Sequence, residues 1–140
     1  MTLPAGLVAR TIFVDTSAFY SELNPRDALH ANAVATFTSI VAESRLLVTS
    51  NLVVAETHAL ILRRMGRDIA AGWLERMEDF NIVFETEEDS EAAQDIIARH
   101  DDKDFSYADA VSFALMERLG IGVAFAFDDD FRQYGLEVIP

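Results

Sequence analysis

Residues 11–17, Thr-Ile-Phe-Val-Asp-Thr-Ser, decide the fold class of this chain. The first four are apolar or β-branched, which favours a buried strand. The strand predicted at Thr11–Val14 stops at Asp15, and Thr16 to Leu23 has the pattern of one or two helical turns before Asn24-Pro25. A buried strand that ends in an acid and continues into a helix is typical of a parallel sheet covered by helices.

The rest of the chain repeats this alternation of short strands and helices. Further strands are predicted at residues 46–49, 81–84 and 122–127, with a last edge strand at residues 137–139. Helices are predicted from Asp27 to about 43, from Ser50 or Asn51 to about 65, and at about 67–79, 86–99 and 106–119, with loops or turns at 100–105 and 128–134. We therefore expect one domain over residues 1–140, an α/β fold with three α/β/α layers around a parallel sheet of four or five strands.

The composition excludes several classes of protein. The chain has 140 residues, 51% of them hydrophobic, and no cysteine, which argues against disorder and excludes disulfide scaffolds and thiolate sites. No apolar run approaches the roughly 20 residues that cross a bilayer. The first residues lack the basic and apolar pattern of a signal peptide. We expect a cytoplasmic protein with no membrane partner.

The net charge of −13 sets a condition on any partner. Such acidity opposes binding to a polyanion, because phosphates are normally attracted by Lys and Arg. Ten of the 11 basic residues are arginine, which contacts phosphate at two points better than lysine does. A cationic metal or protein partner is the other way to balance the charge.

Two candidate acids directly follow predicted strands. Asp15 ends the first strand, and Asp128 follows the apolar run Val123–Phe127 and opens the triplet Asp128–Asp130. Parallel sheets place their chemistry beyond the carboxyl ends of the strands. The structural alternatives are a helix N-cap for Asp15 and a solvated loop for the triplet.

Two further acids fall near helix starts. The residues three and four positions from Glu56 are all apolar, so we expect Glu56 on the buried side of its helix, where it needs a partner. A buried pair with arginine is the alternative. Asp109 stands three residues after Ser106, which also fits a capping box.

The four acids together predict a divalent cation site. At an effective dielectric of about 20, two carboxylates ~6 Å apart repel by roughly 3 kcal/mol, so several in one crevice require protons or a cation. Oxygen ligands suit Mg²⁺ or Mn²⁺. The chain offers no cluster of histidines for zinc, and His58 does not form a His-Glu-x-x-His motif with Glu56.

Four short segments carry these acids: Phe13–Ala18, Ser50–Glu56, Phe105–Ala110 and Phe127-Asp128-x-x-Phe131. In this order and at these separations they resemble the PIN-domain family of metal-dependent ribonucleases, and within it the VapC-type toxins of toxin–antitoxin pairs. The resemblance covers nearly the whole chain. It implies a PIN-like fold, cleavage of RNA, a protein antitoxin as partner and a homodimer.

The resemblance also implies roles for particular residues. The metal-binding acids would be Asp15, Glu56, Asp109 and Asp128, with Mg²⁺ or Mn²⁺ as cofactor. The hydroxyl of Ser17 or Thr16 would help near the metal, and Asp104 and Asp130 would be additional or outer acids. The last segment departs from the family pattern Thr-Phe-Asp-x-His-Phe, because Ala126 replaces the threonine and Asp130 replaces the histidine.

These residues suggest a mechanism. We expect Asp15, Asp109 and Asp128 to hold the metal, and Glu56 to orient or deprotonate water or to hold a second ion. The resemblance implies products with 5′-phosphate and 3′-hydroxyl ends. The densest basic group could grip the RNA backbone, although a helix C-terminus also favours such charges; its members are Arg63, Arg64 and Arg67.

Other function classes remain open at this point. A haloacid-type phosphatase needs a second Asp where this chain has Ser17, and a receiver domain needs a lysine at a late strand end, whereas Lys103 precedes a helix. A non-catalytic module could use the acidic crevice to receive an arginine of a partner. A PIN ribonuclease that is not a toxin also fits the sequence.

Overall fold

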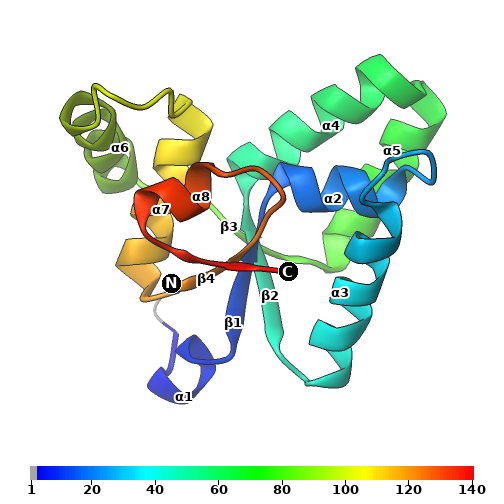
Figure 1. The fold of residues 1–140 in the computed structure, drawn as a ribbon, viewed down its shortest axis with the longest axis horizontal. Coiled ribbons are helices and arrows are strands. Elements are labelled where there is room, and N and C mark those ends of the chain that lie inside the picture. Colours follow the sequence, from blue (N-terminus) through cyan, green and yellow to red (C-terminus); the bar gives the residue numbers. More distant parts are fainter. Residues whose placement is uncertain (1–2) are drawn as a thin grey trace.

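In this computed structural model, which describes residues 3–140, five parallel strands form one central sheet (Figure 1). The strands are β1 (Thr11–Val14), β2 (Leu46–Ser50), β3 (Asn81–Val83), β4 (Val123–Phe125) and β5 (Glu137–Ile139). Their order is β3-β2-β1-β4-β5, with every neighbouring pair parallel. The prediction of a parallel sheet is confirmed. Residues 1–2 of the predicted domain lie outside the described residues.

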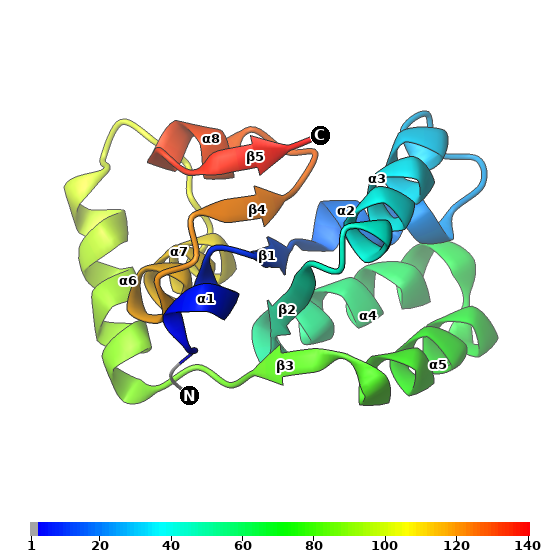
Figure 2. The same cartoon turned by 90° about the horizontal axis from the view of Figure 1, so that it is seen from below.

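Helices cover both faces of the sheet, so the predicted three layers are confirmed (Figure 2). One face carries α2 (Thr16–Leu23), α3 (His30–Ala42), α4 (Asn51–Met65) and α5 (Arg67–Arg76), which continues into the 3₁₀ turn η1 (Met77–Asp79). The other carries α6 (Glu87–Arg99), α7 (Tyr107–Leu119) and α8 (Asp130–Tyr134), and the short α1 (Ala5–Val8) precedes β1. Crossovers between parallel strands are right-handed. When the chain begins to add strands on the other side of β1, the connecting helices therefore lie on the opposite face of the sheet.

That reversal places the end of β1 at a special position. The chain runs outward from β1 through β2 to β3, then returns to β4 on the other side of β1. The neighbouring strands β1 and β4 therefore flank the switch point of the sheet, where a crevice opens beyond the carboxyl ends of the strands. Asp15 is the first residue after β1, and its N–H donates to the carbonyl oxygen of Phe125 at 3.0 Å.

Aromatic packing attaches the last part of the chain to α7. The ring of Phe113 on α7 stacks on Tyr134 with centroids 4.4 Å apart, and it meets Phe131 edge to face at 5.1 Å. Phe131 also lies against Phe13 of β1. Because three of these rings are fully buried, α8 and the loop before it are held against both α7 and the sheet.

Some predicted boundaries differ from the structure. The helix predicted from Asp27 begins instead at His30, because the Asp27 carboxylate accepts the N–H of Leu29 in a local turn and leaves the helix without a side-chain cap. The helix predicted at 67–79 tightens into the 3₁₀ turn at Met77.

The region after β4 shows two further differences. The strand predicted to reach Phe127 ends at Phe125, because the N–H of Phe127 donates to the Ser17 hydroxyl and not to a neighbouring strand. The expected loop or turn at 128–134 contains the short helix α8, which begins at Asp130. The N–H of Asp130 donates to the Asp128 carboxylate at the start of this helix.

One ion pair between α6 and α7 generates a stability prediction. Asp89 is 2% exposed, and the guanidinium of Arg118 donates two hydrogen bonds to it at 2.8 and 2.9 Å. Replacing Arg118 by Met leaves a buried carboxylate without its partner, so we expect the free energy of unfolding to fall by about 2–3 kcal/mol. Urea titration measures the change.

The exposed pair between Arg99 and Asp95 on α6 provides the matched control. Because water screens that pair, Arg99→Met should cost less than about 0.5 kcal/mol. Equal losses in the two variants would contradict the assignment of a structural role to Arg118.

Candidate functional site

Three of the predicted acids meet at the switch point. One carboxylate oxygen each from Asp15, Asp109 and Asp128 lies within 4.8 Å of the other two. Asp15 follows β1, Asp109 is the third residue of α7, and Asp128 lies three residues beyond β4. The sheet and α7 thus bring together acids that are separated by up to 113 residues in the sequence. We call these three residues the carboxylate cluster.

Ser17 connects the two strand ends that carry the cluster. Its hydroxyl donates to Asp15 Oδ2 at 2.7 Å and accepts the N–H of Phe127 at 2.9 Å. Asp15 also accepts the N–H of Ser17 as the N-cap of α2. The capping role and the cluster role of Asp15 are therefore compatible, and the cap fixes one oxygen of the carboxylate.

Asp109 likewise combines a structural role with its place in the cluster. It forms a capping box with Ser106, in which its Oδ2 accepts the Ser106 N–H at 3.4 Å and its own N–H donates to the Ser106 hydroxyl at 3.1 Å. The carboxyl of Asp130, at the start of α8, lies close enough to raise the pKa of Asp109. Asp130, predicted as an outer helper, thus borders the cluster.

The crowding of these acids raises their affinity for protons. Burial, followed by the neighbouring Asp130 carboxyl and the charge of Asp128, raises the pKa of Asp109 to about 7. Burial and the adjacent Asp15 carboxylate raise the pKa of Asp128 to about 7. Burial also raises the pKa of Asp15, although the hydrogen bonds from Ser17 oppose the shift. Without a cation, the cluster therefore retains protons at neutral pH.

No basic side chain neutralises the cluster among the described residues. The ion pairs formed within residues 3–140 include none of the three cluster acids, and they also omit Glu56 and Asp130. The nearest pair in sequence joins Arg132 to Asp129, which lies outside the cluster. The structural alternative for Glu56, a buried pair with arginine, is therefore wrong.

Glu56 lies differently from its prediction. The residue is exposed, and the buried positions of α4 are Val53, Thr57 and Ile61. The buried stripe is thus centred about 100° around the helix from Glu56, because successive residues turn by that angle. Loss of solvent around its carboxylate and then the charge of Asp128 raise the pKa of Glu56. Glu56 therefore stands at the rim of the cluster and not in its centre.

Two other residues predicted to act near the metal, Thr16 and Asp104, lie outside the carboxylate cluster. The hydroxyl of Thr16 is buried and accepts a hydrogen bond from Thr57 at 3.0 Å, so it joins α2 to α4 and makes no contact with a cluster carboxylate. Asp104 is exposed in the loop before α7 and lies outside the cluster. Of the two predicted hydroxyl helpers, only Ser17 touches a cluster acid.

Of the three predicted RNA-binding arginines, Arg63 and Arg64 lie in the last turn of α4, and Arg67 is the first residue of α5. All are exposed, and Arg64 covers the ring of Tyr20 with its guanidinium carbon 5.4 Å from the centroid. Arg63 is about 10 Å further along the helix than Glu56, because each residue rises 1.5 Å. The structure does not bring these arginines to the carboxylate cluster.

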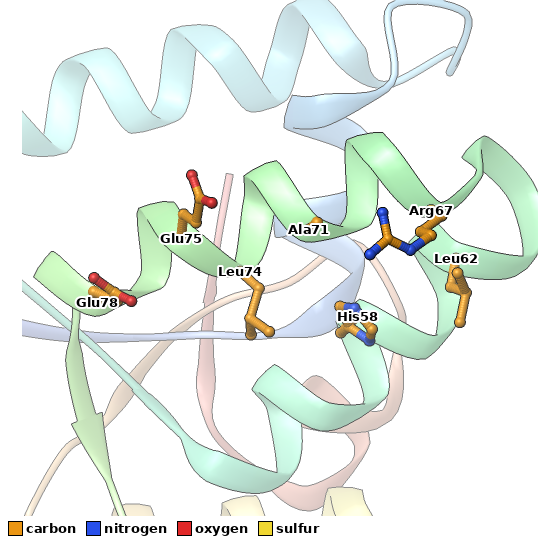
Figure 3. Close-up of a pocket in the computed structure, with 7 residues that line it drawn as sticks. All are labelled: His58, Leu62, Arg67, Ala71, Leu74, Glu75 and Glu78. Atoms are coloured by element: carbon orange, nitrogen blue, oxygen red, sulfur yellow. The ribbon is translucent and has the colours of Figure 1, made fainter.

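A groove between α4 and α5 holds one of these arginines. Its volume is about 560 Å³, and Figure 3 shows Arg67 and His58 at its sides with Leu62 and Leu74 nearby. Arg67 also lies 3.6 Å from the exposed Asp68. The groove is separate from the carboxylate cluster, since it contains no cluster acid.

The donor set of the cluster fits a hard divalent cation. Carboxylate oxygens from three directions converge without a compensating positive charge, and neither sulfur nor imidazole contributes. Such a set suits Mg²⁺ or Mn²⁺, which retain several waters and bind through a few carboxylates. The residues that would hold the ion directly are Asp15, Asp109 and Asp128.

The fold and the cluster define a class of protein: an α/β/α sandwich with a parallel sheet and an acidic site at its switch point. The PIN domain family profile matches residues 12–136. The chain is 37% identical over 132 residues to a 23S rRNA-specific endonuclease, VapC20 of Mycobacterium tuberculosis, and the match covers 92% of this chain and 98% of the relative. The chain belongs to the PIN domain family.

Solved structures agree with this assignment. The crystal structure of VapC20 from Mycobacterium tuberculosis, described as a toxin that cleaves the sarcin–ricin loop, has a TM-score of 0.82 with 34% identity and covers 89% of this chain and 95% of its own. FitAcB from Neisseria gonorrhoeae has a TM-score of 0.70 with 20% identity, covering 92% of this chain and 96% of its own, and shares the fold.

The sequence could not identify every group that shapes the site. The N–H of Phe127 donates to the Ser17 hydroxyl. Because every residue type except proline carries a backbone N–H, the sequence does not reveal this contact. The side chain of Asn51 at the start of α4 accepts the N–H of Glu85 after β3, a contact between distant segments.

Within residues 3–140, no helix is long and apolar enough to cross a membrane.

The raised pKa values predict how pH and metal control stability. The metal-free folded protein binds protons more tightly than the unfolded chain, because Asp109 and Asp128 have pKa values of about 7 against an ordinary 3.8. Its free energy of unfolding should therefore fall as pH rises between about 4 and 7. Mg²⁺ should restore stability above about pH 7, where the carboxylates are free of protons. Thermal unfolding with and without Mg²⁺ measures both effects.

Asp128→Asn serves as the control for this measurement, since it removes one titrating group and one candidate ligand. The variant should show a shallower fall with pH and a smaller shift with Mg²⁺. A metal-free wild-type protein whose melting temperature does not fall over this range would contradict the assigned proton affinities.

Proposed function

We propose that this chain is a metal-dependent endoribonuclease that hydrolyses phosphodiester bonds in RNA with Mg²⁺ or Mn²⁺. The single observation that carries the proposal is the uncompensated cluster of Asp15, Asp109 and Asp128 at the switch point. The 37% sequence identity to an rRNA-specific endonuclease over 132 residues supports RNA as the substrate, so ribosomal RNA is the first substrate to test.

The cluster acids hold the ion, and Ser17 positions one of them. When bound, the ion lowers the pKa of water and neutralises charge on the phosphoryl oxygens. The Ser17 hydroxyl donates to Asp15 Oδ2, which keeps that carboxylate directed into the crevice. The same hydroxyl accepts the N–H of Phe127 and so holds the backbone just before Asp128. Such supporting hydrogen bonds limit the movement of metal ligands.

Glu56 acts on the attacking water from the rim of the cluster. Its raised pKa makes it a better proton acceptor than an ordinary glutamate. Water attacks the phosphorus and gives a proton to Glu56, and the bond to the 3′ oxygen breaks as that oxygen takes a proton from solvent. The products carry a 5′-phosphate and a 3′-hydroxyl. In this role Glu56 needs solvent access, which its exposed position provides.

The chain acts as the toxin of a type II toxin–antitoxin pair and forms a homodimer. The likeness to VapC20, which is described as a toxin, supports the first part. A toxin–antitoxin complex from Klebsiella pneumoniae and VapBC2 from Rickettsia felis, bound to a DNA fragment from their promoter, share the fold. An antitoxin that inserts an arginine into the acidic crevice would neutralise the cluster and block RNA.

Asp15→Asn tests the nuclease directly. The substitution keeps the N-cap but removes the charge of a candidate ligand, so cleavage of ribosomal RNA with Mn²⁺ should fall by roughly a hundredfold or more. Asp104→Asn is the matched control, because Asp104 is exposed outside the cluster and its loss should change the rate less than about twofold. Sequencing of the cut ends maps the cleaved bond.

Two results would remove the proposal. Equal cleavage by the wild-type protein and Asp15→Asn would identify a contaminating nuclease. A wild-type protein that binds Mn²⁺ but cuts no RNA would favour the non-catalytic interaction module. Cleavage that no co-expressed partner protein inhibits would retain the nuclease and favour a PIN ribonuclease outside a toxin pair.

A further inference from the structure

Two exposed aromatic rings lie on segments that adjoin the carboxylate cluster, and neither contributes to the core. Phe84 is 70% exposed, the highest value among the large hydrophobic side chains of the described residues, and Tyr107 is 43% exposed. Single exposed apolar residues are ordinary on protein surfaces. The position of these two beside a candidate active site is the feature that requires an explanation.

Phe84 lies at the same edge of the sheet as the cluster. Ser50 of β2 pairs with Val83 of β3 and, in the register with β1, stands level with Asp15. Phe84 is therefore one residue beyond that level and two strands away, a separation of about 10 Å at normal strand spacing. The following residue is tied to the start of α4, where the Glu85 N–H donates to Asn51.

Tyr107 lies at the start of α7, the helix that carries Asp109. It precedes Asp109 by two positions, which places the two Cα atoms about 5 Å apart but turns the Tyr107 side chain away from that carboxylate, toward α6. Its hydroxyl lies 2.6 Å from that of Ser90 on α6. This hydrogen bond holds the ring in one orientation while leaving it partly exposed.

The charges around these rings make phosphate contacts a poor source of affinity. Glu87 and Glu88 are exposed in the first turn of α6, close in sequence to Phe84. The exposed arginines of α4 lie toward the opposite end of that helix from its junction with the site. An acidic protein that binds RNA here therefore needs contacts that do not depend on positive charge, and base stacking on aromatic rings is such a contact.

We propose that Phe84 and Tyr107 form a stacking platform for unpaired bases of the RNA that is cut at the carboxylate cluster. This inference rests on the proposed nuclease function and narrows its substrate class. Bases inside a duplex are already stacked on each other, so the platform selects RNA whose bases are splayed in a loop or single strand. The hydroxyl of Tyr107 positions its ring and does not read the base.

The test measures both binding and cleavage of one defined RNA. The probe is a fluorescent hairpin with a single-stranded loop of about ten nucleotides, a length within the range of single-strand binding sites. Anisotropy without divalent ions gives the Kd, and cleavage with Mn²⁺ gives kcat and KM. We expect Phe84→Ala and Tyr107→Ala each to raise Kd and KM by roughly fivefold or more, with kcat unchanged.

Conservative variants separate stacking from folding defects. Phe84→Trp keeps a ring and should bind within about twofold of the wild-type protein. Tyr107→Phe keeps the ring but loses the hydrogen bond to Ser90, so its Kd should lie between those of the wild-type protein and Tyr107→Ala. Val41→Ala removes a side chain that is 67% exposed on α3 and should have no effect on Kd. A hairpin with abasic sugars in its loop keeps the phosphates but lacks the loop bases. The wild-type protein should therefore bind it with a higher Kd than the intact hairpin, whereas the Kd values of the alanine variants should differ little between the two hairpins.

The outcomes distinguish this inference from the proposed function. Unchanged Kd in both alanine variants, or wild-type binding that does not depend on the loop bases, overturns the platform whether or not the protein cuts RNA. Loop-dependent binding by a protein that cuts nothing retains the platform and removes the nuclease. Alanine variants that alter the oligomeric mass but not the Kd assign the rings to a protein interface and overturn the proposal.

Discussion

The backbone pairing of β1 with β4 holds acidic side chains closer together than their charges favour. The N–H of Asp15 is fixed to the carbonyl oxygen of Phe125, and the Ser17 hydroxyl joins Asp15 to the N–H of Phe127. At an effective dielectric of about 20, carboxylates at such distances repel by about 3 kcal/mol per pair. Because the sheet prevents their separation, protons or a divalent cation must offset the repulsion.

The third side of the site depends on helix packing. Asp109 belongs to the first turn of α7, where its capping box fixes one oxygen, and the buried rings of Phe113 and Phe131 hold α8 against the same helix. This packing keeps the loop that carries Asp128 near Asp109. Rigid elements on both sides therefore preorganise the ligands, so binding of an ion requires little ordering of the chain.

The sequence predicted the end of β1 well, so Asp15 could be placed directly after it, and Asp109 followed from its helix start. Asp128 was expected directly after its strand but lies three residues beyond β4, because the bond from the Phe127 N–H to Ser17 ends the strand early. Glu56 could not be placed, since apolar neighbours on both sides of a helix leave its buried stripe uncertain by one residue, or about 100°. The choice between Thr16 and Ser17, and the strand order, depend on tertiary contacts that local patterns do not contain.

The position of the bound ion can be measured by anomalous diffraction. Crystals of the protein grown or soaked with Mn²⁺ above about pH 7, where the cluster loses its protons, give an anomalous signal that marks the metal. We expect one principal peak bonded to oxygens of Asp15, Asp109 and Asp128. A cluster without manganese, or one closed by a basic side chain of the same chain, would contradict this expectation.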